Sequence, residues 1–386
     1  MTASNSTALN NIFTSISQTI GSANIDLSSE TVIKDIVTPY FTVPQNAGAI
    51  RLSTAAYNGS AFGAPVAADP SVTAAIDPAT RAVNVTGFDF NQNYVSTNAK
   101  ADGTFGKKLI IEFDVSVEAG FLGGNQVPTN DGQSGIYAKG IMIKAFDVPT
   151  QDVEVKSITP TADDKTIYLG DSANLQELVH QNATFDGTNN AFVNVTYTVK
   201  DENGGTVGTY TVPAGSSSGI WEWSDAASGG TVAPEQTTTY TVTCTVSPTQ
   251  SGTYESVSKD AASTITVNTC SLTISKKVTG DGANPNQTFV FDVKDSAGKL
   301  VTTIVLKDGD SKTITGLAVG KYTVTEDTNW SWSYSIVGDN NKTATLSGTT
   351  PSATVAVTNH YDSHNWLTSI ADVINTWISG SAAQKN

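Results

Sequence analysis

The sequence predicts an all-β protein made of tandem β-sandwich domains, with short helices near its two ends. Three observations predict this fold. Apolar residues occupy every second position in segments such as 107–117, which is typical of a strand with one buried face. Thr, Ser, Gly, Asn and Val are abundant, and this mixture suits short strands joined by polar turns. Helical periodicity is confined to the first 40 residues and to the segment after residue 365.

Length and charge narrow the class of protein. The chain has 386 residues, enough for about two to four domains. Its formal net charge of -15 repels phosphate backbones, so we do not expect it to bind nucleic acid, and it also disfavours anionic lipid. Charged residues make up only 15% of the chain and hydrophobic residues 38%, both low for a cytosolic enzyme. This composition favours an exported structural or binding protein.

Signals for cofactors, metals and membrane insertion are missing from the sequence. No Cys/His pattern indicates a metal site, and the Gly-rich GFLGGN segment (120–125) lacks the Lys-Ser/Thr ending of a phosphate loop. No hydrolase motif accompanies His180. We therefore expect no cofactor, no metal and no turnover of a substrate. No signal peptide, membrane span or sorting motif is recognisable, so an exported chain would be a mature fragment or a piece of a precursor.

The N-terminal third predicts a helical segment followed by a β-rich domain. Residues 1–24 contain a helix over 7–20, where apolar residues fall at helical spacing. A second short helix is expected at 30–38. The β-rich domain covers 25–150, and the stretch 148–155 is expected to be a linker.

The middle domain is expected at 151–269, with strands spaced as in an Ig-type sandwich. One of them, TTTYTVTCTVSP (237–248), places Cys244 on its apolar face. The strand pattern sets Cys244 opposite a residue near Ile265, which disfavours a disulfide with Cys270 but leaves it open.

The last domain is expected at 270–361 as a compact β-sandwich of seven short runs. Residues 362–386 then change character, because apolar residues repeat at i, i+3, i+4 and i+7. This pattern predicts an amphipathic C-terminal helix. Its polar face lacks basic residues, so we expect it to pack on protein rather than on a membrane surface.

Three polar residues of the last domain continue apolar rows. Lys276 shares its strand parity with Leu272 and Ile274 in SLTISKK, and Glu326 ends the buried row of KYTVTED. Asn359 ends the row of VAVTN in the same way. Burying a lone Lys or Glu is costly without a partner, so we expect the three side chains to meet in the core.

The pieces LTISKKVTG, LKDGDSKTITGLAVGKYTVTED and VAVTN resemble a Cna-B type (prealbumin-like) domain of Gram-positive surface proteins and pilins. The resemblance implies an isopeptide bond between Lys276 and Asn359, with Glu326 as its promoter. Burial disfavours both charges, so that a neutral amine and a neutral acid can coexist. The alternative is a buried Lys–Glu–Asn network without a covalent bond. Lys277 is the less favoured nucleophile because its parity is opposite.

The two preceding domains carry weaker resemblances. Residues 25–150 resemble a domain of Firmicutes surface proteins that usually follows a von Willebrand A domain, through VTGFDFNQNYVS, GKKLIIEF and GFLGGNQVPTNDGQSGIY. Residues 151–269 are similar to bacterial Ig-like repeats. A second isopeptide bond in the first domain has candidates of the right residue types, but exposed strand charges are the simpler interpretation. These candidates are Lys107 or Lys108, Asn130, and Glu112 or Asp114.

Together these features favour a pilin- or adhesin-like stalk on the outside of a Gram-positive cell, whose ligand is a protein or glycan of a host or neighbouring cell. One alternative is a carbohydrate-binding or accessory module of a secreted protein, in which exposed tryptophans form a sugar platform. The candidates for that platform are Trp221, Trp223, Trp330 and Trp332. The other alternative is a phage or particle structural protein that self-assembles through its terminal helices.

Overall fold

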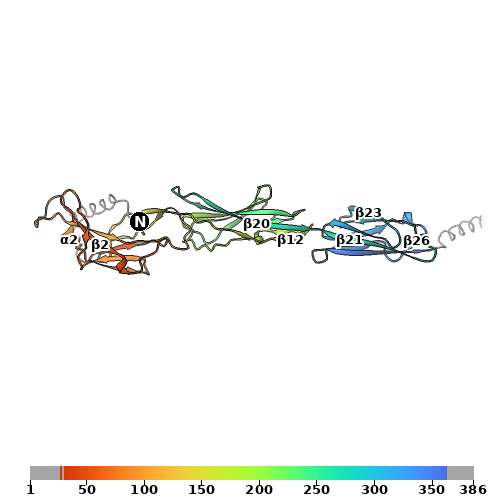
Figure 1. The fold of residues 1–386 in the computed structure, drawn as a ribbon, viewed down its shortest axis with the longest axis horizontal. Helices are drawn as coiled ribbons and strands as arrows, with labels where there is room; N and C mark the ends of the chain where they lie inside the picture. Colours follow the sequence, from red (N-terminus) through yellow and green to blue (C-terminus); the bar gives the residue numbers. More distant parts are fainter. Residues whose placement is uncertain (1–26, 28–29, 363–386) are drawn as a thin grey trace, which may run out of the picture.

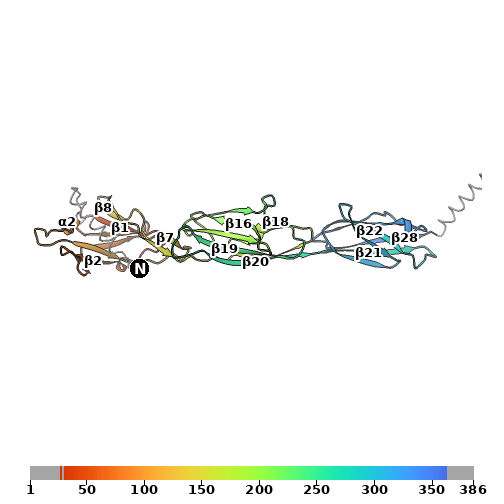
Figure 2. The same cartoon turned by 90° about the horizontal axis from the view of Figure 1, so that it is seen from above.

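The chain forms a row of three β-rich units placed end to end (Figures 1 and 2). The computed structural model describes Leu27 and residues 30–362, so the helices predicted at 7–20 and beyond 362 lie outside the described residues. Within the described part, the helices are single turns: η1 (Ala47–Ala49), α2 (Phe90–Asn93), α3 (Leu175–Leu178) and η2 (Thr328–Trp330). The predicted all-β fold class is confirmed. None of the described helices is long and apolar enough to cross a membrane.

The first unit contains three sheets. A five-stranded sheet has the order β4-β5-β1-β8-β9, a three-stranded sheet the order β3-β2-β6, and β10 pairs with β7. Its apolar core includes Ile33, Val83, Val85, Leu109 and Ile136. The strands are β1 (Val32–Ile36), β2 (Arg51–Ala56), β3 (Val66–Ala67), β4 (Thr73–Asp77), β5 (Ala82–Thr86), β6 (Lys107–Glu112), β7 (Gly124–Pro128), β8 (Gly135–Ala138), β9 (Ile141–Ala145) and β10 (Thr150–Val153).

Two sequence-based predictions in this unit are wrong. The segment 30–38 is not a helix but contains the central strand β1, which pairs with both β5 and β8. Its Ile33 and Val37 alternate into apolar cores, and its β-branched residues favour a pleated strand. The segment 148–155 is not a free linker either, because it contains β10, which pairs with β7.

The second unit is dominated by a six-stranded sheet with the order β12-β20-β19-β15-β16-β17. The alternating rows of β15 and β19 bury Val195, Tyr197, Val242 and Val246 in its core. The strands are β11 (Thr161–Ala162), β12 (Lys165–Tyr168), β13 (Ala173–Asn174), β14 (Val179–His180), β15 (Val193–Lys200), β16 (Thr206–Val212), β17 (Ile220–Trp223), β18 (Thr231–Val232), β19 (Thr238–Pro248) and β20 (Val257–Asn268).

The two cysteines lie in different cores and are both free. Cys244 is paired across β19 and β20 with Lys259, whereas Ile265 lies opposite Thr238, so the position expected for Cys244 was wrong. The disulfide that the sequence left open is not formed. Burial raises the pKa of the Cys244 thiol to about 11, which keeps it protonated and unreactive at neutral pH.

The third unit is a sandwich of two four-stranded sheets, β24-β21-β28-β26 and β23-β22-β25-β27. The first and last strands, β21 and β28, run parallel and side by side over nine residue pairs from Ser271↔Ser352 to Thr279↔His360. The strands are β21 (Cys270–Thr279), β22 (Phe289–Lys294), β23 (Leu300–Leu306), β24 (Ser311–Leu317), β25 (Gly320–Glu326), β26 (Tyr334–Ile336), β27 (Lys342–Leu346) and β28 (Ser352–Tyr361). The sequence prediction of seven runs missed β27, which is short and half polar.

The joint between the first two units is a set of specific contacts that we call the clasp. Asn125, 1% exposed, donates through Nδ2 to the backbone oxygens of Gln250 (2.9 Å) and Tyr254 (2.8 Å). Its Oδ1 accepts from the Tyr254 N–H at 3.0 Å. Asp152 accepts from the backbone N–H and the hydroxyl of Thr253, and these donors hold the pKa of Asp152 below its usual range. The clasp therefore joins β7 and β10 to the β19–β20 loop.

Removing the clasp amide is expected to loosen this joint. Asn125→Ala leaves three backbone groups of the partly exposed β19–β20 loop without the side-chain partner that they have in the parent, at a cost of up to about 1–3 kcal/mol each before water replaces it. Small-angle X-ray scattering should then show a broader distribution of interdomain distances. Gln151→Ala is the matched control, because Gln151 is exposed and donates only to the neighbouring Asp152 backbone oxygen. Unchanged scattering of the Asn125 variant would contradict a rigid clasp.

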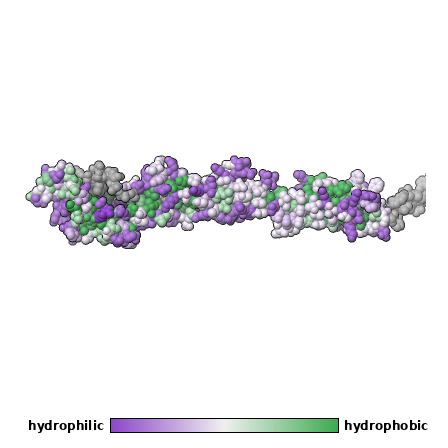
Figure 3. Space-filling model, viewed as in Figure 1, coloured by the Kyte–Doolittle hydropathy of each residue, from purple (hydrophilic) through white to green (hydrophobic). Residues whose placement is uncertain are grey.

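The joint between the second and third units is also short. β20 ends at Asn268 and β21 begins at Cys270, and the Val319 N–H donates to the Leu169 backbone oxygen at 2.8 Å. On the face drawn in Figure 3, polar and apolar residues are interspersed along all three units. The described chain is thus an extended rod whose units are linked by direct backbone continuity.

Candidate functional site

The three polar residues singled out from the sequence meet inside the third unit. Lys276 comes from β21 and Asn359 from the neighbouring β28, where Asn359 pairs with Val278. Glu326 ends β25 in the opposite sheet. All three are at most 2% exposed, and each continues a row of buried apolar residues. The parity of the three strands therefore brings an amine, an amide and a carboxyl group to one place between the sheets.

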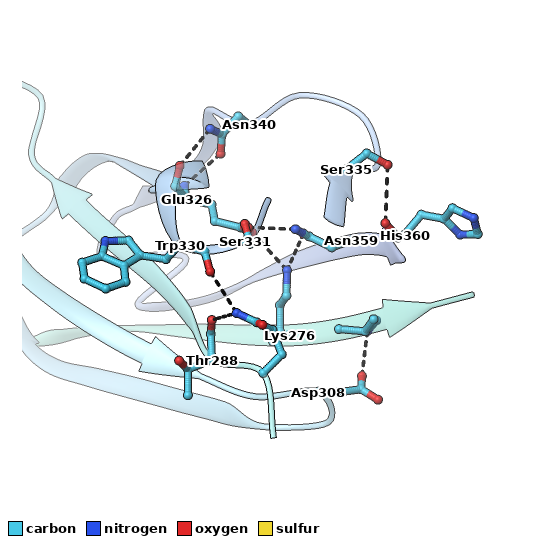
Figure 4. A network of polar contacts seen from close by, with 12 residues as sticks. Lys276, Thr288, Asp308, Glu326, Trp330, Ser331, Ser335, Asn340, Asn359 and His360 are labelled. Atoms are coloured by element: carbon cyan, nitrogen blue, oxygen red, sulfur yellow. Dashed lines mark hydrogen bonds and ion pairs between the residues drawn. The ribbon is translucent and has the colours of Figure 1, made fainter. Parts of the chain in front are cut away.

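The three side chains contact one another directly (Figure 4). Lys276 Nζ donates to Glu326 Oε2 at 3.0 Å and to Asn359 Oδ1. Asn359 Nδ2 donates to Glu326 Oε1 at 2.8 Å. Each carboxyl oxygen of Glu326 thus faces one reactant, and the lysine nitrogen lies against the amide group of Asn359.

Apart from these two polar partners, the lysine nitrogen lies against aromatic rings. Its Nζ lies 3.8 Å from the ring centroid of Phe289 and 5.5 Å from that of Phe291. The side chains of Lys276 and Glu326 are both fully inaccessible to solvent. Burial lowers the pKa of Lys276, and the hydrogen bond and charge of Glu326 oppose that shift. A lowered amine pKa makes the neutral, nucleophilic form of Lys276 easier to reach.

Two further residues, which the sequence analysis missed, hold Glu326 in place. Asn340 Oδ1 accepts from the Glu326 backbone N–H at 2.8 Å, and Asn340 Nδ2 donates to the Glu326 backbone oxygen at 3.0 Å. This side chain takes the place of a strand partner beyond the last β25–β27 pair, Val324↔Lys342. Ser331 donates to Glu326 Oε1 at 3.0 Å. Both residues lie in turn segments, where strand parity gives no signal.

The alternative residues do not join this site. Lys277 is exposed, as its opposite parity predicts. In the first unit, Lys108 Nζ lies over the ring of Phe62 at 4.4 Å, and Asp114 is ion-paired with Arg51 at 3.9 Å.

The remaining candidates for a second isopeptide bond are equally dispersed. Asn130 forms a β-bridge with Val37, Glu112 is exposed at the end of β6, and Lys107 lies at the start of that strand. The structure does not assemble these residues into a second site.

The tryptophans do not form one platform. Trp221 and Trp223 stack on each other, with ring centroids 4.7 Å apart, and pack against the core of the second unit. Trp330 and Trp332 belong to the third unit, where they are 66% and 84% exposed. Among the described residues, no group of three His, Cys, Asp or Glu side chains could hold a metal ion.

Comparison with known proteins gives one family match. Residues 272–362 match a domain of unknown function, DUF5979. That match covers the whole Lys276–Glu326–Asn359 site but only the third unit of the chain. No curated protein matches the sequence.

Several solved structures are similar at low identity. A bacterial adhesin from Mobiluncus mulieris containing intramolecular disulfide, isopeptide and ester bond cross-links is 14% identical, with a TM-score of 0.28, over 45% of this chain and 85% of that chain. The pilus 2b backbone protein of group B streptococcus is 17% identical, with a TM-score of 0.26, over 53% and 98%. The major pilin T-13 of Streptococcus pyogenes is 14% identical, with a TM-score of 0.25, over 53% and 97%. At such values the function must be argued from the side chains of this chain itself.

Proposed function

We propose that this chain is a stalk of a pilin- or adhesin-like protein on the outside of a bacterial cell, and that its third unit carries a Lys276–Asn359 isopeptide bond. The observation that carries the proposal is the buried contact of Lys276 Nζ with both Glu326 and the Asn359 amide. The rod of three β-rich units is consistent with a spacer between the cell and a surface ligand, a protein or a glycan. The only chemistry proposed is one self-directed reaction, not turnover of a substrate.

The reaction uses three groups already in contact. The Lys276 proton passes to Glu326, which leaves a neutral amine beside a neutral acid. The amine nitrogen attacks Cγ of Asn359, while Glu326 keeps Oε2 beside the attacking nitrogen and Oε1 beside Nδ2, placed to pass a proton from one to the other. A proton relayed by Glu326 reaches Nδ2, the Cγ–Nδ2 bond breaks, and ammonia leaves. Glu326 is protonated after the reaction, as it was when the amine attacked, and a new amide bond joins β21 to β28. Because the folded core holds the reacting groups in contact, an amide exchange that is otherwise very slow can proceed, and it proceeds a single time in each chain.

The position of the bond suits a chain under tension. Force entering at Cys270 runs along β21 to Lys276, and force leaving at Tyr361 runs through Asn359 at the end of β28. A covalent Lys276–Asn359 link would connect these two points directly. The chain between them, whose ends are 83 positions apart in sequence, would then carry no load. Such a unit would resist extension even if its strands separated.

Intact mass spectrometry tests the proposal. The purified full chain is expected to be lighter than its sequence mass by one ammonia, whereas Lys276→Ala and Glu326→Ala are expected to show their full sequence masses. The Lys276 variant lacks the nucleophile and the Glu326 variant lacks the proton carrier. Lys277→Ala is the matched control, since its side chain points to solvent. A parent chain at full sequence mass would reduce the site to a hydrogen-bonded network.

A further inference from the structure

The turn that follows β25 sends one small side chain into the site. Asp327 caps η2 by accepting from the backbone N–H of Asn329 at 3.1 Å, and its Oδ2 accepts from Trp330 Nε1, also at 3.1 Å. Gln287 Nε2 donates to the Trp330 backbone oxygen at 3.0 Å and ties the turn to the loop before β22. Held in this way, Ser331 is 1% exposed, although both adjacent tryptophans are largely exposed. The turn is built to point Ser331 inward.

The Ser331 hydroxyl completes the hydrogen bonds of the Glu326 carboxyl group. Oε2 accepts from Lys276, whereas Oε1 accepts from Ser331 at 3.0 Å and from Asn359 at 2.8 Å. A carboxyl group that turned about its last bond would exchange or lose these partners. Ser331 favours the orientation in which Oε1 faces the departing nitrogen of Asn359 and Oε2 faces the attacking nitrogen of Lys276 (Figure 4).

We propose that Ser331 is a positioning residue for the cross-linking reaction, acting on Glu326 both before and after ammonia leaves. This inference rests on the function proposed above. Ser331 itself forms and breaks no covalent bond. The new bond joins Lys276 Nζ to Asn359 Cγ, the Cγ–Nδ2 bond breaks, and the proton is carried by Glu326.

The departure of ammonia explains why a second donor is needed. Asn359 Nδ2 is one of the two donors to Oε1, and it leaves with the ammonia. Without Ser331, Oε1 would then be a buried acceptor with no donor, which costs about 1–3 kcal/mol. With Ser331 in place, Oε1 keeps a partner through the transition state and in the product.

The hydroxyl can be removed without dismantling the turn. The other contacts of Ser331 are made by its backbone, whose N–H donates to the Thr328 oxygen at 3.2 Å and whose oxygen accepts from Tyr334 at 2.8 Å. Ser331→Ala retains both. Ser335→Ala is the matched control, because Ser335 is exposed on β26 and its hydroxyl contacts only the His360 oxygen, at 3.5 Å.

The test follows the loss of ammonia with time. The full chain and its variants are made in a short cell-free pulse, synthesis is stopped, and intact masses are recorded at intervals beside the near-ultraviolet circular dichroism of the folded chain. Ser331→Ala is expected to fold like the parent but to cross-link about tenfold more slowly, as expected from about 1.4 kcal/mol of lost transition-state stabilisation. Ser331→Thr, which restores a hydroxyl, is expected to recover most of the rate, and Ser335→Ala to match the parent.

The rates of ammonia loss distinguish the role of Ser331 from the cross-link itself. If the parent loses ammonia and Ser331→Ala does so at the same rate, the positioning role is wrong while the proposed cross-link stands. If the parent never loses ammonia, both fall. Should Ser331→Ala fold poorly, Ser331→Cys keeps a side chain of similar shape with a weaker donor. A folded Cys variant is expected to react at an intermediate rate, and the parent rate in that variant would equally overturn the role.

Discussion

Glu326→Gln is expected to give a folded third unit without its cross-link, with a free energy of unfolding about 4–5 kcal/mol below that of the parent. Glutamine has the size of glutamate and can still contact Lys276 and Asn359, but it cannot carry a proton between them. The missing bond would close a chain segment whose ends are 83 positions apart. Constraining a loop of that length stabilises a fold by about this amount, as it does for a disulfide.

Denaturant unfolding of the full chain measures this loss. The unfolding of the third unit is followed through a fluorescent label attached near Trp330 or Trp332. Glu222→Gln is the matched control, because Glu222 is exposed on β17 of the second unit. The control is expected to unfold like the parent. Equal stability of the parent and Glu326→Gln, with the parent fully cross-linked by mass, would show that the bond adds no thermodynamic stability.

The residues of the candidate site could be selected from sequence because strand parity is a local property. Lys276, Glu326 and Asn359 each extend a row of alternating apolar residues. The alternation therefore predicts that each side chain lies on the buried face of its strand and points into the core. That they share one point along the sandwich depends on the parallel pairing of β21 with β28. This pairing is non-local and was not predicted; the expectation that the three side chains meet came from the cost of burying Lys276 and Glu326 alone. Their chemical roles remain a prediction.

The strand β1 shows where local patterns fail. Val32, Ile33, Ile36 and Val37 fit one side of a helix as well as they fit a strand, and a short apolar run does not separate the two. The pairing of β1 with β5 and β8, remote in sequence, decides the outcome. The β-branched character of four of the six residues from 32 to 37 is the local signal that favours a strand over a helix.

The clasp and the turn of Ser331 lay beyond prediction for a different reason. Asn125, Ser331 and Asn340 are polar residues in turns or at strand ends, a setting in which they usually face water. Their burial depends on which remote backbone groups they meet, such as the Gln250 and Tyr254 oxygens for Asn125. The alternation of apolar and polar residues in the sequence carries no information about these contacts, so only the three-dimensional structure reveals them.

Asp35→Asn is expected to stabilise the first unit at neutral pH. Asp35 lies on β1 between Ile33 and Val37, facing the same side, and its Oδ1 is buried with no hydrogen-bond partner among the described residues. The charge of the neighbouring Lys34 is directed elsewhere, with Nζ over the ring of Tyr137. Burial raises the pKa of Asp35 from 3.8 to about 6. A shift of that size corresponds to about 3 kcal/mol of destabilisation when the carboxyl group is ionised.

The sign of the pH dependence follows from this shift. Below pH 3.8 the carboxyl group is protonated in both the folded and the unfolded chain, so the folded state loses nothing. As the pH rises toward 6, the unfolded chain ionises freely while the folded chain resists, and stability falls until the group is ionised in both states. The parent first unit should therefore weaken over this interval, whereas Asp35→Asn should lack this decline and gain up to about 3 kcal/mol by pH 8.

Calorimetry of the full chain at a series of pH values checks this result, since the transition of the first unit should move while those of the other units do not. Asp114→Asn is the control from the same unit. Its exposed carboxylate pairs with Arg51 at 3.9 Å, a surface contact worth at most about 1 kcal/mol. If Asp35→Asn is no more stable than the parent at pH 8, the ionised carboxylate must have found solvent or a donor. In that case the core of the first unit would open locally around β1 to admit water, because burial alone shifts the pKa of Asp35 and no ion pair among the described residues includes it.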